Sequence, residues 1–275
     1  MNTRSSKLIP VAAAAAAVIC GVVRFFQIVS LTDYSTGFFI DGAGFGGILI
    51  YILLVGMIAA LAALAFVGRK KGSDAAYSLS PDGMGQNATR FLGASEVLAA
   101  LLIGVRVTEG GSVVMLAATV IAAAALIVSG FTLVGRIVPP KFTGHLKIVA
   151  ALYMFMRLGE YFNSYLIMRH NAEKLIVIFS YWLVIVFLGF LARFYARLET
   201  KDSRLAGIIF SLSTFIFSAA HAISDILAKL FGGAGAAAFV NLNYDACAAA
   251  VLSGTYLFVM YFTSKTKDYE PIVVE

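Results

Sequence analysis

His221 and Asp225 lie four residues apart inside a long apolar run, Leu205 to Leu230, where ionisable side chains are rare. On a helix this spacing places both side chains on one face, one turn apart. A charge at the middle of a bilayer costs about 3 kcal/mol on insertion scales, so such residues face a protein interior or a watery cavity. A histidine beside a carboxylate can carry a proton or bind a cation. The pair is therefore the first candidate site.

A second polar stripe lies in the apolar run at residues 146–168. Tyr153, Arg157, Glu160 and Ser164 follow the i, i+4, i+3, i+4 spacing of one helical face, and Asn163 lies beside them. Arg157 and Glu160 are close enough in sequence to pair within one helix. Because charged side chains within a bilayer face a protein interior or a watery cavity, we expect this face to point into the protein.

The first apolar run also carries two polar residues, Arg24 and Gln27. Their Arg-x-x-Gln spacing is similar to Arg157-x-x-Glu160, and this similarity suggests a weak duplication of two parallel four-helix halves. Internal repeats of this kind are frequent in transporters.

The elements that position these residues follow from composition. The chain has 275 residues, of which 60% are hydrophobic and 13% charged, far more apolar than a soluble domain. A run of about 20 apolar residues spans a bilayer as a helix. We therefore predict an all-α, polytopic transmembrane helix bundle forming one integral membrane domain, residues 1–275, with eight spans near residues 8–31, 46–67, 91–107, 112–134, 146–168, 175–194, 205–230 and 246–262.

The first, third and eighth runs each allow an alternative to a plain membrane span. The third and eighth runs are the shortest, and either suits a buried or partly re-entrant helix. The first run follows basic residues, as a secretory signal does, but its polar residues and the absence of a small-x-small cleavage site favour an uncleaved helix.

The basic residues predict orientation rather than nucleic-acid binding. The net charge is +6, but the 21 lysines and arginines are dispersed over loops and not gathered on a soluble face. With eight spans, most of them, Lys147 included, fall in segments on one side, whereas Arg106, Arg169 and Lys174 fall on the other. Cytoplasmic loops carry the excess of basic residues, so both termini are expected in the cytoplasm. The expected partner is the lipid bilayer, and the two cysteines suit core positions rather than a disulfide or metal site.

This orientation places most of the intramembrane polar residues in the external half of the bundle. Arg106 and Asp245 fall at the same level, and Glu96 alone lies on the cytoplasmic side. We predict a polar pocket open to the outside, lined by Arg24, Gln27, Arg157, Glu160, Asn163, His221 and Asp225. The alternative is that these groups only pair with one another in a dry core.

The pocket favours transport or sensing of a small polar solute or ion. One alternative is a membrane-embedded metal-dependent hydrolase using His221, Asp225 and Glu160, although motifs of known intramembrane proteases are incomplete and Lys229 lies too near a helix end for a retinal lysine. Another is a structural or assembly subunit of a membrane complex. We favour a role that is not enzymatic. No pattern identifies a cofactor, a metal, a protein partner or the substrate.

Arg24-Phe-Phe-Gln27 followed by Asp33-Tyr-Ser-Thr36-Gly37-Phe38 resembles an Arg-x-x-Gln…Asp-x-x-Thr-Gly signature near the first span of uncharacterised multi-pass membrane proteins from anaerobic Gram-positive bacteria. The resemblance implies a bacterial inner (plasma) membrane. It also implies that Arg24, Gln27 and Asp33 shape the mouth of the pocket.

Overall fold

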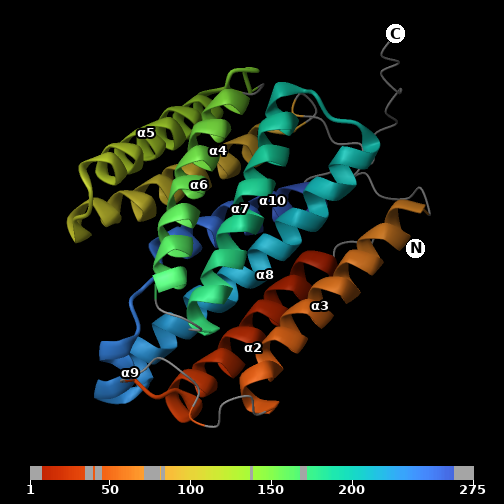
Figure 1. The fold of residues 1–275 in the computed structure, drawn as a ribbon. Coiled ribbons are helices and arrows are strands. Elements are labelled where there is room, and N and C mark those ends of the chain that lie inside the picture. Colours follow the sequence, from red (N-terminus) through yellow and green to blue (C-terminus); the bar gives the residue numbers. More distant parts are fainter. Residues whose placement is uncertain are drawn as a thin grey trace.

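The computed structural model describes residues 8–34, 40, 45–70, 81, 84–136, 139–167 and 172–262. Almost all of these residues are helical (Figure 1). The elements in chain order are α2 (Leu8–Leu31), α3 (Phe45–Lys70), α4 (Gln86–Val105), the 3₁₀ helix η3 (Arg106–Glu109), α5 (Val113–Gly135), α6 (Thr143–Ile167), α7 (Ala172–Ala196), α8 (Lys201–Phe231), α9 (Gly233–Phe239) and α10 (Tyr244–Phe262). Part of the resemblance signature, Thr36-Gly37-Phe38, Arg169 and most of the loop 68–90 lie outside the described residues.

Each of the eight predicted apolar runs contains a helix, and seven helices are long and apolar enough to cross a membrane. The short third and eighth runs, now α4 with η3 and α10, are among the seven. The helix that is not among them is α6, because its polar stripe lowers its hydropathy. The chain therefore has the make-up of a multi-pass helical membrane protein, whereas the eighth crossing and the side of the termini remain predictions.

Helices α8 and α10 lie at the centre of the bundle. α8 contacts α2, α3, α7 and α10, and α10 also packs against α4. Around them, α4 pairs with α5 and α6 with α7, each as a hairpin of chain neighbours (Figure 1). The two central helices carry the polar residues His221, Asp225 and Asp245, so the fold places these groups inside the bundle.

Small residues allow the closest helix contacts, as is usual for helices in membranes. A Cβ added at Gly93 of α4 would lie 2.5 Å from the carbonyl oxygen of Gly130 in α5, and one at Gly130 would lie 2.7 Å from that of Gly93. A Cβ at Gly21 of α2 would lie 2.7 Å from Ile223 of α8. Backbones therefore touch where α4 meets α5 and where α2 meets α8.

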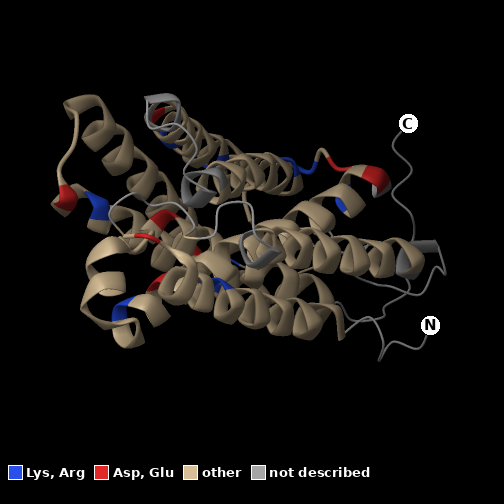
Figure 2. Cartoon of the chain, turned by 60° about the horizontal axis from the view of Figure 1, so that its bottom comes forward, with Lys and Arg blue, Asp and Glu red and all other residues tan. Residues whose placement is uncertain are grey.

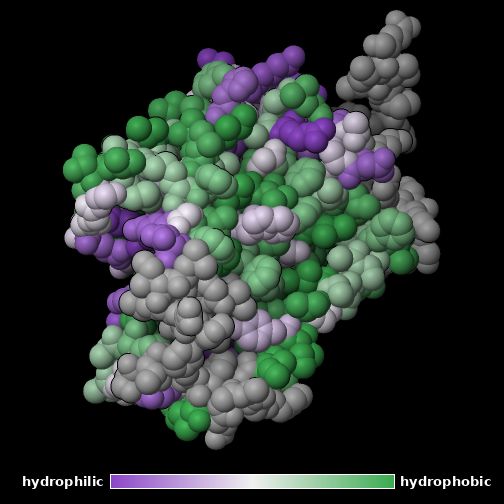
Figure 3. Space-filling view, viewed as in Figure 1, coloured by the Kyte–Doolittle hydropathy of each residue, from purple (hydrophilic) through white to green (hydrophobic). Residues whose placement is uncertain are grey.

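The outer surface suits a hydrocarbon environment. Large apolar side chains such as Val55, Phe131 and Phe155 are more than half exposed. On the face shown in Figure 3, hydrophobic residues form a broad band with hydrophilic residues gathered toward its ends. Most of the helical ribbon carries no charge, and charged residues gather mainly toward the ends of the bundle (Figure 2). This distribution matches apolar spans with polar ends.

The glycine-rich segment after α8 is not a plain loop. Helix α8 ends at Phe231, the chain turns at Gly233 with a φ of 73°, and it then forms the short helix α9. Three alanines, Ala236 to Ala238, favour this helix. We call the end of the bundle where α8 meets α9 the α9 end; α9 and residues 240–243 lead the chain from there into α10.

Candidate functional site

Asp245, the second residue of α10, is the centre of a buried polar cluster at the α9 end. Only 1% of the residue is exposed. Tyr153 donates a hydrogen bond of 2.9 Å to Oδ1, and Arg157 Nε donates one of 3.2 Å to Oδ2. Tyr181 also donates to Oδ2, and Arg106 Nε forms an ion pair with it at 3.1 Å. One carboxylate thus joins η3, α6, α7 and α10, and its charge is compensated by two guanidinium groups.

Each arginine of this cluster has a second, more exposed acidic partner three residues along its own chain segment. Arg106 Nη1 lies 2.7 Å from Glu109 Oε2, and Arg157 Nη1 pairs with Glu160. The side chains of Glu109 and Glu160 are 40% and 51% exposed. The predicted Arg157–Glu160 pair is therefore present, but it is the outer edge of a larger network around Asp245.

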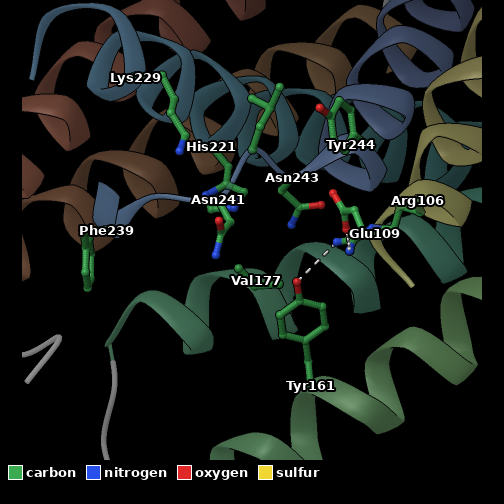
Figure 4. Close-up of a pocket in the computed structure, with 11 residues that line it drawn as sticks. Arg106, Glu109, Tyr161, Val177, His221, Lys229, Phe239, Asn241, Asn243 and Tyr244 are labelled. Atoms are coloured by element: carbon green, nitrogen blue, oxygen red, sulfur yellow. Dashed lines mark hydrogen bonds and ion pairs between the residues drawn. The ribbon is translucent and has the colours of Figure 1, made fainter. Parts of the chain in front are cut away.

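A polar cavity of about 620 Å³ lies next to this cluster. Its volume is in the range of small-molecule sites, about 300–1,000 Å³. Side chains from four elements form one part of its wall, namely Arg106, Glu109, Tyr161, Val177, His221 and Lys229. Figure 4 shows Tyr161 pointing toward Arg106 on one side, with Lys229 and His221 on the other.

The segment between α9 and α10 forms the rest of the described wall. It contributes Phe239, Asn241, Leu242, Asn243 and Tyr244, and both asparagine side chains reach into the same space (Figure 4). Asn243 also fixes the start of α10, because its side-chain oxygen accepts a 3.1 Å hydrogen bond from the backbone N–H of Ala246. The wall therefore carries amide, hydroxyl and charged groups, as a site for a polar solute requires.

His221 and Asp225 differ in their position relative to the cavity. His221 lines the cavity, whereas Asp225 lies behind it and is 1% exposed. His221 Nε2 is 3.6 Å from Asp225 Oδ2, which also accepts a 3.4 Å hydrogen bond from the backbone N–H of Asn243. Asp225 Oδ1 has no hydrogen-bond partner among the described residues. The pair thus links the cavity to a buried carboxylate.

Arg24 and Gln27 are buried residues of α2. They are 4% and 3% exposed, and Arg24 Nη1 donates a long hydrogen bond of 3.5 Å to Gln27 Oε1. The positive charges of Arg24 and Lys229 act on Asp225. Arg24 therefore balances charge at the α2–α8 contact and does not face the cavity.

The structure brings only part of the predicted pocket together. Its described lining includes His221, but it does not include Arg24, Gln27, Arg157, Glu160, Asn163 or Asp225. Arg157 stands one layer away, with its guanidinium 5.3 Å from the ring centre of Tyr161. Asn163 is exposed near the end of α6.

Three residues of the buried cluster, Arg106, Tyr181 and Asp245, were not among the predicted pocket residues. Arg106 and Asp245 were placed at the right level but outside the predicted pocket, because each falls at the end of an apolar run. Tyr181 gave no signal, since a tyrosine within an apolar run usually fills the core. A buried carboxylate needs donors, so Asp245 was the residue from which the cluster was predictable.

A second buried ion pair lies toward the other end of the bundle. Lys147 Nζ is 2.5 Å from Glu96 Oε2, donates a 2.6 Å hydrogen bond to Ser129, and lies 5.3 Å from the ring centre of Tyr195. Lys147 was counted among the basic residues of the cytoplasmic segments, but its side chain is not at the surface: the residue lies inside α6 and is 0% exposed. Its positive charge compensates that of Glu96, the one intramembrane polar residue that was predicted on the cytoplasmic side.

The described residues contain no group of three His, Cys, Asp or Glu side chains that could hold a metal ion. In particular, Glu160 pairs with Arg157 at the outer edge of the Asp245 cluster rather than joining His221 and Asp225. A divalent metal normally requires three or four protein ligands. The ligand set that a metal-dependent hydrolase would use is therefore not assembled in this part of the chain.

The chain was compared with protein-family models, curated proteins and solved structures. No protein-family model matches the chain, and no curated protein or solved structure is significantly similar to it.

Proposed function

We propose that this protein binds a small polar solute or ion in the cavity at the α9 end, in order to transport or sense it across a bacterial plasma membrane. The observation that carries the proposal is the cavity itself, about 620 Å³ in volume and lined in part by charged and amide side chains, within a bundle of apolar helices. Polar cavities inside membrane bundles commonly serve substrate or ion pathways.

The predicted orientation supports an external opening of this cavity. The helices that run toward the α9 end are those predicted to run outward, and the basic residues favour the opposite end as cytoplasmic. The resemblance of Arg24-x-x-Gln27 and Asp33 to the bacterial signature supports the plasma membrane as the location. A solute would therefore reach Arg106, His221 and Lys229 from outside the cell.

The test is a thermal-unfolding screen of the purified protein in detergent against sugars, polyols, amino acids, organic acids and inorganic ions. A solute that binds the native state raises the unfolding midpoint; at 100 times its Kd it contributes about 2.7 kcal/mol. Asn241→Trp fills the cavity from an exposed wall position and should remove the shift. Ala238→Trp, exposed on α9 but outside the wall, should retain it.

An unchanged midpoint with every solute class would contradict the proposal, as would equal shifts in the two tryptophan variants. That outcome would favour a structural or assembly subunit. One observation supports this alternative: two arginines and two tyrosines of the protein itself contact the carboxylate of Asp245.

A further inference from the structure

The guanidinium group of Arg106 has an inner and an outer edge. Its Nε lies 3.1 Å from Oδ2 of the buried Asp245, and this contact fixes the inner edge. Nη1 and Nη2 point to other partners, Glu109 Oε2 at 2.7 Å and the hydroxyl of Tyr161 at 3.4 Å. Arg106, Glu109 and Tyr161 all line the cavity. The cluster therefore holds Arg106 from behind and presents its Nη1 and Nη2 groups at the cavity wall (Figure 4).

The partners on this outer edge are replaceable. The side chain of Glu109 is 40% exposed, and the hydrogen bond from Arg106 to Tyr161 is long. Glu109 ends the 3₁₀ helix and is followed by Gly110 and Gly111, which have positive φ angles of 78° and 139° and where an added Cβ would meet no atom within 4 Å. An ion pair with a partly exposed partner contributes little to stability, so exchanging Glu109 for another carboxylate costs little.

The charges of the wall favour an anion. Arg106 and Lys229 are the basic residues of the described lining, and Glu109 is its acidic residue. Lys229 Nζ donates a 2.6 Å hydrogen bond to the carbonyl oxygen of Ala237, which holds the ammonium group beside the cavity. If a solute carboxylate replaces Glu109 at Arg106, the buried charge beside Asp245 does not change, and the exposed Glu109 returns to water.

We propose that the cavity takes a small organic anion, whose carboxylate binds the Nη1 and Nη2 edge of Arg106 in place of Glu109. This inference rests on the proposed function and names its substrate class. The planar fork of arginine matches a carboxylate through two parallel hydrogen bonds. Glu109 thus acts as an internal occupant of the site when no solute is bound, and Lys229 attracts the anion from the opposite wall.

The chain supplies a matched control. Arg157 and Glu160 have the same spacing as Arg106 and Glu109, and Arg157 contacts the same Oδ2 atom of Asp245, at 3.2 Å. Glu160 is also about half exposed, but neither Arg157 nor Glu160 lines the cavity. Removing the charge of Glu160 therefore breaks a similar ion pair, without changing the charge of the cavity wall or the competition for the cavity-facing arginine.

The experiment measures binding by isothermal titration calorimetry to the full chain in lipid nanodiscs. The probes are succinate, inorganic phosphate, glycerol and putrescine. Succinate should bind the wild-type protein, and Glu109→Gln should tighten its Kd about fivefold, because a competing ion pair worth up to about 1 kcal/mol is removed. Glu160→Gln should change it less than twofold. Arg106→Lys, which keeps the charge but lacks the planar fork, should weaken succinate binding at least tenfold.

Equal Kd changes in Glu109→Gln and Glu160→Gln would overturn the proposal. So would stronger binding of phosphate, glycerol or putrescine than of succinate, and so would the absence of heat with all four probes. Failure here leaves the proposed function intact if another solute class still raises the unfolding midpoint and loses that effect in Asn241→Trp. If no solute in the screen raises the unfolding midpoint, both the proposed function and the inference of an organic anion are wrong.

Discussion

A single carboxylate, that of Asp245, ties together four elements of the bundle. Two arginines and two tyrosines surround it, and the residue is 1% exposed. Ion pairs removed from water gain strength from the low dielectric, but losing one partner leaves an uncompensated charge. The cost of a change at Asp245 should therefore greatly exceed the cost of a change at the exposed acids.

Asp245→Asn should lower the free energy of unfolding by about 3–5 kcal/mol, because Arg106 and Arg157 then lack their common buried counter-charge. Glu160→Gln removes an acid that is 51% exposed and should lower it by less than about 1 kcal/mol. Thermal unfolding midpoints in detergent compare the two. Equal midpoints for both variants would show that the buried contacts of Asp245 add nothing beyond those at the surface.

The buried pair of Lys147 and Glu96 allows a similar test toward the other end of the bundle. Lys147→Met leaves Glu96 without its cation and should cost about 3–5 kcal/mol. The double variant Lys147→Met/Glu96→Leu removes both charges and should recover most of that loss, since an apolar replacement of a buried pair is often tolerated. A double variant no more stable than Lys147→Met would argue that the pair itself stabilises the bundle.

At the scale of elements, the α4–α5 hairpin depends on two glycines. Gly93→Ala would place a Cβ 2.5 Å from the carbonyl oxygen of Gly130, so the helices must separate. The expected loss is about 1–3 kcal/mol in the free energy of unfolding. Gly104→Ala, on the same helix but with no atom within 4 Å of the added Cβ, is the control and should be neutral or slightly stabilising. Similar unfolding midpoints for the two variants would refute the close approach.

The connection between α7 and α8 carries a carboxyl group outside the spans. Burial raises the pKa of Glu199 above its ordinary value of 4.5, although Arg204 and Arg193 act in the opposite direction. A raised pKa means that the folded protein retains this proton more strongly than the unfolded chain. The resulting stabilisation is complete below pH 4.5 and is lost as the pH rises through the raised pKa.

Glu199→Gln keeps the side chain neutral at every pH. The unfolding midpoint of this variant, relative to that of the wild type, should therefore increase as the pH rises from 4 to 8. A difference between the two proteins that stays constant, or that decreases over this range, would contradict a raised pKa for Glu199.

The sequence predicted the helices better than their contacts, and the reason is physical. A single run of about 20 apolar residues can satisfy its own backbone hydrogen bonds in a bilayer only as a helix, and each predicted run does contain a helix. Which face of α2 meets α8, however, depends on packing at Gly21, which no apolar period reveals. Arg24 was therefore expected in the pocket but lies at a helix contact, whereas His221 does line it.

For the whole molecule, the access of a solute to the cavity depends on which end of the bundle faces the outside of the cell. Single cysteines report this in a Cys20→Ala/Cys247→Ala background, labelled in intact cells with a membrane-impermeant maleimide. Thr108→Cys at the α9 end should react, and Lys141→Cys at the other end should react only after the membrane is opened; both positions are exposed. These two variants calibrate the decisive measurement.

That measurement is the labelling rate of Asn241→Cys, in the cavity wall, with and without the solute that most raises the unfolding midpoint. The maleimide should reach this cysteine from outside the cell, as it reaches Thr108→Cys. The solute should slow the labelling of Asn241→Cys but not that of Thr108→Cys. Labelling only in opened membranes, or a rate that no solute changes, would contradict a solute-binding cavity open to the outside.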